Sequence, residues 1–85
     1  MFVIYGKKKC GFCKRAIEWL RVNGYDFRYC SMDEKLEELK ELSTIYNWNT
    51  VPMIIQNKDG QELFIGGYDD LIKRMQVKTS EEDDK

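Results

Sequence analysis

The sequence contains no histidine, and this absence removes both the commonest general base of enzymes and the commonest metal ligand of proteins. It has no apolar run close to the roughly 20 residues that a membrane-spanning helix needs. It also lacks an excess of either charge, because 14 Lys and Arg stand against 15 Asp and Glu, a net charge of -1. This balance argues against nucleic acid and against an anionic membrane as partners.

The sequence has three cysteines, an odd count. A secreted protein held together by disulfides normally has a larger, even number, whereas a close cysteine pair in a reducing compartment is more often catalytic or metal-binding. The N-terminus also lacks the succession of basic, apolar and small residues that marks a signal peptide. We therefore expect a cytoplasmic protein of one domain with a modest core, since 85 residues bury only about 60–65% of the surface of the unfolded chain.

The spacing of apolar residues predicts elements in the order βαβαββα. Residues 2–5 are a short continuous apolar run, typical of a strand that is buried on both faces and therefore central in its sheet. Asn23-Gly24 predicts the end of a helix, and Asp59-Gly60 predicts a hairpin turn. The predicted strands cover residues 2–5, 25–32, 51–56 and 62–65, and the predicted helices cover residues 11–22, 36–46 and 69–75.

This order predicts an α/β fold with a four-stranded mixed sheet flanked by helices on both faces. The first βαβ unit should be parallel and right-handed, and the final hairpin antiparallel. Ser31 and Glu34 have the spacing of a capping box for the second helix, with Asp33 as a competing cap. Residues 79–85 contain four acids and no apolar side chain, so we expect a domain over residues 1–77 and a disordered acidic tail over residues 78–85.

The motif Cys10-Gly11-Phe12-Cys13 stands just after the first strand, where a helix is predicted to begin. A thiol reacts as the thiolate, which backbone N–H groups at a helix N-terminus and nearby cations stabilise. Cys10 has both the helix N-terminus and the cations beside it, so it is the predicted nucleophile. Cys13, one turn into the helix, should be more buried and act as the resolving thiol. The neighbouring cations are Lys7, Lys8, Lys9, Lys14 and Arg15.

Two other interpretations of the pair remain open from the residues alone. Both cysteines could be chance core residues. They could also be half of a zinc site, although zinc usually takes four ligands and only Cys30 and carboxylates remain to supply the others. Cys30 itself, at the end of the second strand, is predicted to be a small buried hydrophobic residue.

Four segments of the chain match a known pattern, which are Lys7 three residues before Cys10, the Cys10-Gly11-Phe12-Cys13 pair, Thr50-Val51-Pro52, and Gly66-Gly67-Tyr68-Asp69-Asp70-Leu71. Through them, the chain resembles the glutaredoxins of the thioredoxin superfamily over residues 1–77. The resemblance implies a thioredoxin-like fold and a glutathione site.

The resemblance also implies roles for single residues. Pro52 would be a cis-proline facing the thiols, and Val51 would pair through its backbone with the cysteinyl part of glutathione. Asp70, together with Asp69, would receive the γ-glutamyl amino group, and Lys7 would pair with the glycyl carboxylate. The alternatives are a trans proline that begins an edge strand and aspartates that only cap a helix, the latter expected mainly of Asp69. The implied glutathione-binding set is Lys7, Phe12, Thr50, Val51, Pro52, Gly67, Asp69 and Asp70.

The implied function is that of a glutathione-dependent thiol–disulfide oxidoreductase, which reduces protein disulfides and glutathione mixed disulfides through Cys10 and Cys13. Glutathione supplies the electrons, and no tightly bound cofactor or metal is needed. The expected partners are disulfide-containing or glutathionylated proteins, with ribonucleotide reductase as a family-level candidate, and the protein should be a monomer.

Two rival functions remain open. Most dithiol members have Pro-Tyr between the cysteines, whereas Gly11-Phe12 resembles the branch that handles iron–sulfur clusters. The alternative is therefore a dimer that holds a [2Fe–2S] cluster through one Cys10 from each chain and two glutathiones. A further alternative is a thioredoxin-like reductant served by a flavoprotein reductase, against which Asp69-Asp70 argues.

Overall fold

The computed structural model describes the backbone of residues 1–83 and the side chains of residues 1–75. Its elements follow the predicted order. No helix of this described part is both long enough and apolar enough to cross a membrane. The elements are β1 (Phe2–Gly6), α1 (Gly11–Val22), β2 (Phe27–Ser31), α2 (Leu36–Tyr46), β3 (Met53–Lys58), β4 (Gln61–Gly66) and α3 (Tyr68–Asp83).

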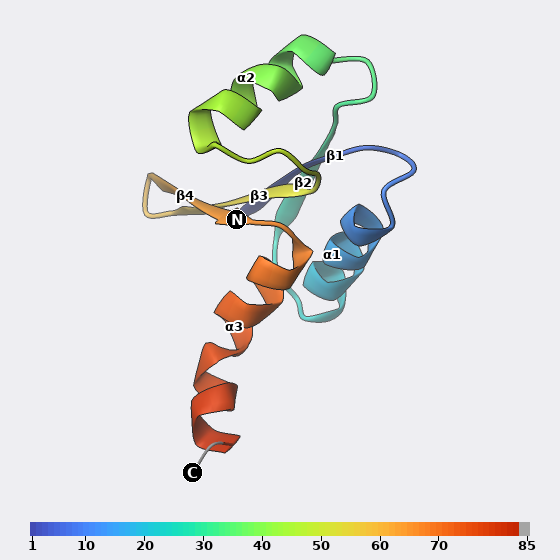
Figure 1. Ribbon diagram of the computed structural model, residues 1–85. Helices are drawn as coiled ribbons and strands as arrows, with labels where there is room; N and C mark the ends of the chain where they lie inside the picture. The colour runs from blue at the N-terminus through green and yellow to red at the C-terminus, as the bar shows by residue number, and fades with distance from the viewer. Residues whose placement is uncertain (84–85) are drawn as a thin grey trace.

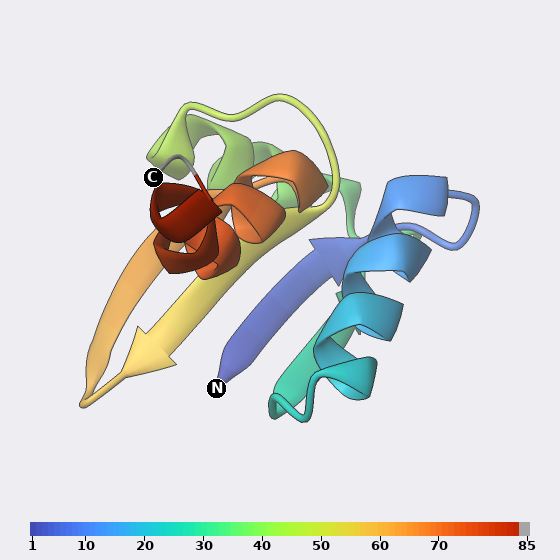
Figure 2. The same ribbon diagram turned by 90° about the horizontal axis from the view of Figure 1, so that it is seen from below.

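The four strands form one mixed sheet (Figure 1), and their order is β2-β1-β3-β4, as Figure 2 shows. β1 pairs with β2 in parallel and with β3 in antiparallel orientation, and β3 and β4 form an antiparallel hairpin. The predicted central position of the first strand is confirmed. It explains the unbroken apolar run, because a strand with neighbours on both edges and helices on both faces has no side exposed to water.

Helices cover both faces of the sheet, as predicted. α1 and α3 lie together on one face and α2 lies on the other (Figures 1 and 2). The main core is on the α1–α3 side, whereas no side chain of α2 is fully buried. Ordering α2 therefore gains less from the hydrophobic effect than ordering the other two helices. The buried cluster consists of Phe2, Ile4, Ala16, Leu20, Ile54 and Leu71.

The predicted capping box of the second helix is wrong. α2 begins at Leu36, and its N-cap Lys35 makes no side-chain capping bond. Ser31 is the last residue of β2, too far from the helix to cap it, and its hydroxyl donates to Asp33 Oδ2 at 2.6 Å instead. Two strands also begin two residues later than expected, β2 at Phe27 and β3 at Met53.

The backbone of α3 continues to Asp83, beyond the predicted last residue Met75. The side chains of the predicted acidic tail, residues 78–85, lie outside the described residues. The division of the chain between residues 77 and 78 stays a prediction.

Candidate active site

Cys10 occupies the N-cap position of α1. Its backbone is extended (φ -89°, ψ 110°), and its Sγ accepts a hydrogen bond from the backbone N–H of Cys13 at 3.1 Å. The first turn of α1 contains no acidic residue. A sulfur at this position faces the unpaired N–H groups and the positive end of the helix dipole, which favour an anion. The fold thus places Cys10 where a thiolate is stabilised.

Cys13 is enclosed, with only 1% of its surface exposed. Burial, together with the hydrogen bond and the nearby charge of Cys10, raises the pKa of the Cys13 thiol to about 12. The enclosure depends on Gly6, because a Cβ there would stand 2.5 Å from Cys13 Sγ. Cys13 therefore stays a neutral thiol at physiological pH, as expected of the resolving cysteine.

Cys13 should consequently react with iodoacetamide far more slowly than Cys10 between about pH 7 and 9, because only the thiolate is nucleophilic. Its pKa is raised, so its reactivity should keep rising as the pH approaches 12. Mass-spectrometric mapping of each alkylated cysteine over time measures this directly. In urea-unfolded protein the two cysteines should react alike. Equal rates in the folded protein would contradict the enclosure of Cys13.

The loop before β3 brings a backbone carbonyl to the nucleophile. The Val51–Pro52 peptide bond is cis, as the resemblance implied. The Cys10 thiol donates a hydrogen bond to the carbonyl oxygen of Val51 at 3.6 Å. Residues 41 positions apart in the chain thus meet at the reactive sulfur.

A pocket of about 330 Å³ lies beside this loop, between the beginnings of α1 and α3. It contains every residue of the predicted glutathione-binding set except Lys7. Two aromatic residues that the sequence did not assign, Trp48 and Tyr68, complete its wall. The full lining is Phe12, Trp48, Thr50, Val51, Pro52, Gly67, Tyr68, Asp69 and Asp70.

Lys7 lies in a neighbouring hollow of about 350 Å³ that shares two walls with the pocket, Thr50 and Val51. The backbone N–H of Cys10 donates to the Lys7 carbonyl at 3.2 Å. The two hollows therefore flank the Thr50-Val51 segment, with two aspartates on one side and a lysine on the other.

The glutaredoxin family model matches residues 2–60, which include the Cys10 and Cys13 pair and the cis-proline loop. The chain belongs to the glutaredoxin family. No curated protein matches it in sequence.

Among solved structures, this glutaredoxin is similar to wheat glutaredoxin, with a TM-score of 0.79 and 25% identity over 89% of this chain and 69% of that one. It is also similar to glutaredoxin from Brucella melitensis, with a TM-score of 0.70 and 25% identity over 92% and 84% of the two chains. The glutaredoxin-like NrdH-redoxin from Escherichia coli, described as having a thioredoxin-like activity profile, has a TM-score of 0.67 and 24% identity over 87% and 92%. The fold is thioredoxin-like, and family and fold support thiol–disulfide oxidoreductase activity.

The two aspartates of this glutaredoxin divide their roles differently from the prediction. Asp70, not Asp69, makes the capping bond, since its Oδ2 accepts from the backbone N–H of Gly67 at 3.0 Å. Gly66 permits this approach, because it has a φ of 122° and a Cβ there would stand 2.7 Å from Asp70 Oδ2. Asp69 is exposed and has no hydrogen-bond partner among the described residues. The sequence could not separate the two, because either position suits a carboxylate at a helix N-terminus.

Asp33 anchors the loop that leads to Cys10, and the sequence did not indicate this role. Its carboxylate accepts from the backbone N–H of Lys8 at 3.0 Å and from the Ser31 hydroxyl. The hydrogen bond from Ser31, more than any other group, holds the pKa of Asp33 below its ordinary value. The loop of residues 7–9 is therefore fastened to the end of β2.

Tyr68 had no role assigned from the sequence, and Cys30 differs from expectation. Tyr68 stacks on Phe12 with ring centroids 6.1 Å apart and an interplanar angle of 29°. The sequence offered one signal for this role, which is that Tyr68 lies inside the segment Gly66-Gly67-Tyr68-Asp69-Asp70-Leu71. Cys30 is half-buried, not buried, because β2 is an edge strand. Within the described residues, no three His, Cys, Asp or Glu side chains gather as ligands for a metal ion.

Proposed function

We propose that this glutaredoxin reduces protein disulfides and glutathione mixed disulfides through Cys10 and Cys13, with glutathione as the reductant. The supporting observation is a pocket lined by both aspartates and by Val51, whose carbonyl oxygen accepts a hydrogen bond from the Cys10 thiol. Neither the family match nor the fold favours the cluster-binding dimer over this function.

Glutathione has an amino group at one end and a carboxylate at the other, and the two hollows match these charges. Asp69 and Asp70 suit the γ-glutamyl amino group, and the macrodipole of α3 suits the adjacent carboxylate. The backbone of Val51 suits the cysteinyl residue in short β-type pairing. Lys7, beyond Thr50 and Val51, suits the glycyl carboxylate. The sulfur of a glutathione bound in this way lies near Cys10.

The reaction begins when the Cys10 thiolate attacks a substrate disulfide. A bond forms between Cys10 Sγ and one substrate sulfur, and the other sulfur leaves and takes up a proton. With a protein disulfide, Cys13 attacks Cys10 Sγ, the substrate thiol is released, and two glutathiones reduce the resulting Cys10–Cys13 disulfide. With a glutathionylated substrate, glutathione remains on Cys10, and a second glutathione removes it as glutathione disulfide.

The high pKa of Cys13 fits this sequence of steps. Burial is the largest cause of the raised pKa of Cys13, and the hydrogen bond and the charge of Cys10 are the other causes that raise it. Both disappear when Cys10 becomes part of a mixed disulfide, because the sulfur is then neutral and bonded. The pKa of Cys13 therefore falls at the stage at which Cys13 has to act as a nucleophile.

Reversing the charge of Asp69 should raise the KM for glutathione about tenfold or more, because a hydrogen bond to a charged group contributes roughly 1.5–3 kcal/mol. Asp69 makes no hydrogen bond among the described residues, so Asp69→Lys should remain folded and lose only the few degrees of melting temperature expected from a reversed charge in the first turn of α3. Glutathione-coupled reduction of a small mixed disulfide measures the KM. Asp59→Lys, at the exposed hairpin turn, is the matched control and should leave the KM unchanged.

The same assay tests the proposed function. Wild-type protein should turn over with glutathione and glutathione reductase. If it turns over only with a flavoprotein thioredoxin reductase, and Asp69→Lys has no effect, the protein is a thioredoxin-like reductant and the proposal fails.

A further inference from the structure

A second hollow, of about 500 Å³, runs along α1 on the other side of Tyr68. We call it the α1 groove. Tyr68 lines both the α1 groove and the pocket beside Cys10, so the two are neighbours across one side chain. Its other lining residues are Lys14, Arg15, Glu18, Trp19, Val22 and Asn23. The function proposed above makes no use of this surface.

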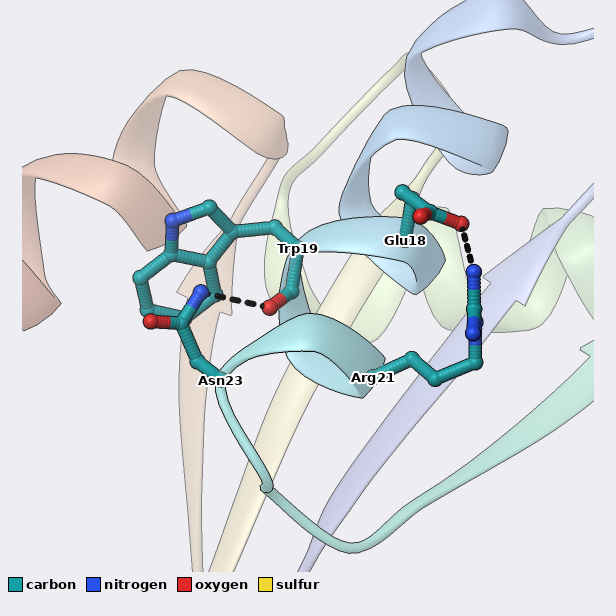
Figure 3. A network of polar contacts seen from close by, with 4 residues as sticks. All are labelled: Glu18, Trp19, Arg21 and Asn23. Carbon is teal, nitrogen blue, oxygen red and sulfur yellow. Dashed lines mark hydrogen bonds and ion pairs between the residues drawn. The ribbon is translucent and has the colours of Figure 1, made fainter.

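The far end of the α1 groove is apolar and well supported. The indole of Trp19 stacks on Tyr25, with ring centroids 5.7 Å apart and planes 12° apart. The Asn23 amide donates to the Trp19 carbonyl at 2.8 Å and closes the end of the helix (Figure 3). Beside them, Val22 is 69% exposed. A fixed aromatic ring next to an exposed aliphatic side chain can bury an apolar side chain of a partner.

The end of the α1 groove near Cys10 is cationic. Lys14 and Arg15 have no ion-pair partner among the described residues, and the Arg15 guanidinium lies 5.4 Å from the centroid of the Phe12 ring. Glu18 is the one acid in the lining, and it pairs with Arg21 at 2.6 Å (Figure 3). The groove therefore presents positive charge near the nucleophile and apolar surface away from it.

The length of the groove sets the length of a possible occupant. α1 has 12 residues and is about 18 Å long at 1.5 Å per residue. An extended chain covers about 3.3 Å per residue, so about five residues span the distance from Cys10 to Val22. A polypeptide whose cysteine reacts at Cys10 can thus reach the apolar end with a side chain about five positions away.

We propose that the α1 groove binds the segment of a protein substrate that flanks its target cysteine. The preferred segment has acidic side chains beside the cysteine, facing Lys14 and Arg15, and a large apolar side chain about five residues away, against Trp19 and Val22. This inference rests on the proposed function, because it assigns a protein substrate class to the same nucleophile.

Two glutathionylated peptides test the proposal. Both have a central cysteine with leucine five positions away on either side, and the residues next to the cysteine are Glu in one and Lys in the other. Wild-type protein should deglutathionylate the acidic peptide with about tenfold higher kcat/KM, since complementary charges accelerate encounter. The ratio should fall at high salt.

Two matched variants test whether the preference for the acidic peptide arises in the α1 groove. Val22→Asp should lower kcat/KM for the acidic peptide about fivefold through lost apolar contact and added repulsion, and leave that for a small mixed disulfide unchanged. Ile45→Asp is the control, because Ile45 on α2 has the same exposed fraction of 69%. Equal effects of the two variants, or equal rates with the two peptides, would overturn the proposal.

A binding experiment keeps this test separate from that of the proposed function. The acidic peptide with serine in place of cysteine cannot react, and it should shift the NMR signal of the Trp19 indole N–H in wild-type protein but less in Val22→Asp. No shift in wild-type protein would overturn the groove proposal, even if turnover with glutathione is normal. A shift without any glutathione-dependent turnover would support the groove and contradict the proposed function.

Discussion

Cys10→Ser is expected to abolish turnover of every disulfide substrate, whereas Cys13→Ser is expected to keep deglutathionylation. The sulfur of Cys10 alone sits at the helix N-terminus, where it accepts the Cys13 N–H and faces the Val51 carbonyl. A serine hydroxyl there is not ionised at neutral pH and cannot form a mixed disulfide. The loss should be about 10³-fold or more, as for removal of other catalytic nucleophiles.

Cys13→Ser separates the two routes. Deglutathionylation needs only Cys10 and a second glutathione, so its rate should stay within a few-fold of wild type. Reduction of a protein disulfide that requires resolution by Cys13 should become slow, with the mixed disulfide accumulating. Glutathione-coupled assays on one small mixed disulfide and one protein disulfide, with mass spectrometry of the trapped species, distinguish these outcomes.

Cys30→Ser is the control for both cysteine variants. Cys30 is half-buried on the edge strand β2, opposite Tyr5 in the register, and it should be dispensable for both reactions. Substantial turnover by Cys10→Ser would show that the nucleophile is wrongly assigned. Loss of deglutathionylation in Cys13→Ser would show that the dithiol is needed for every substrate.

Gly6→Ala should destabilise the protein by about 1–3 kcal/mol, the usual effect of overpacking a closed core. The added Cβ would meet Cys13 Sγ at 2.5 Å, Cys13 Cβ at 3.1 Å and Tyr29 Cε1 at 3.2 Å. Gly6 lies at the end of the central strand β1, so the backbone has little room to withdraw. For a domain of this size each 1 kcal/mol lowers the melting temperature by about 4–8 °C, which thermal unfolding of the reduced protein measures.

Gly11→Ala is the matched control, because no atom lies within 4 Å of a Cβ at that position. Gly11 is the first residue of α1, where alanine is the better helix former, so this variant should be as stable as wild type or slightly more stable. In the double variant Gly6→Ala/Cys13→Ala the two effects should be less than additive, since the sulfur that the new Cβ meets is gone. Strict additivity, or equal stability of the two glycine variants, would contradict the close contact.

The order of elements and the place of the redox pair could be predicted from the sequence, because both depend on local patterns. The run over residues 2–5 is apolar without interruption since β1 has strands on both edges and helices on both faces. Cys10 could be placed at a helix N-terminus because periodic apolar residues begin just after it. The acidic start of the last helix was predicted from neighbouring residues, and the cis form of Pro52 was implied by the family resemblance of Thr50-Val51-Pro52.

The arrangement of side chains in the site needed the tertiary structure. Asp70 rather than Asp69 accepts the capping bond from Gly67, and its carboxylate lies where a Cβ on residue 66 would collide with it, so the glycine at that position leaves it room. Asp33 bonds across 25 positions to the backbone N–H of Lys8, a partner that no pattern within one element indicates.

The sequence by itself therefore determined that this protein has an α/β fold with a reactive cysteine pair, because hydrophobic periodicity and short motifs are properties of neighbouring residues. Only the tertiary structure decided how deeply Cys13 is enclosed by Gly6, which residues complete the pocket, and that the α1 groove adjoins it. Each of these depends on distances between segments far apart in the chain, which arise when the sheet and its helices pack together.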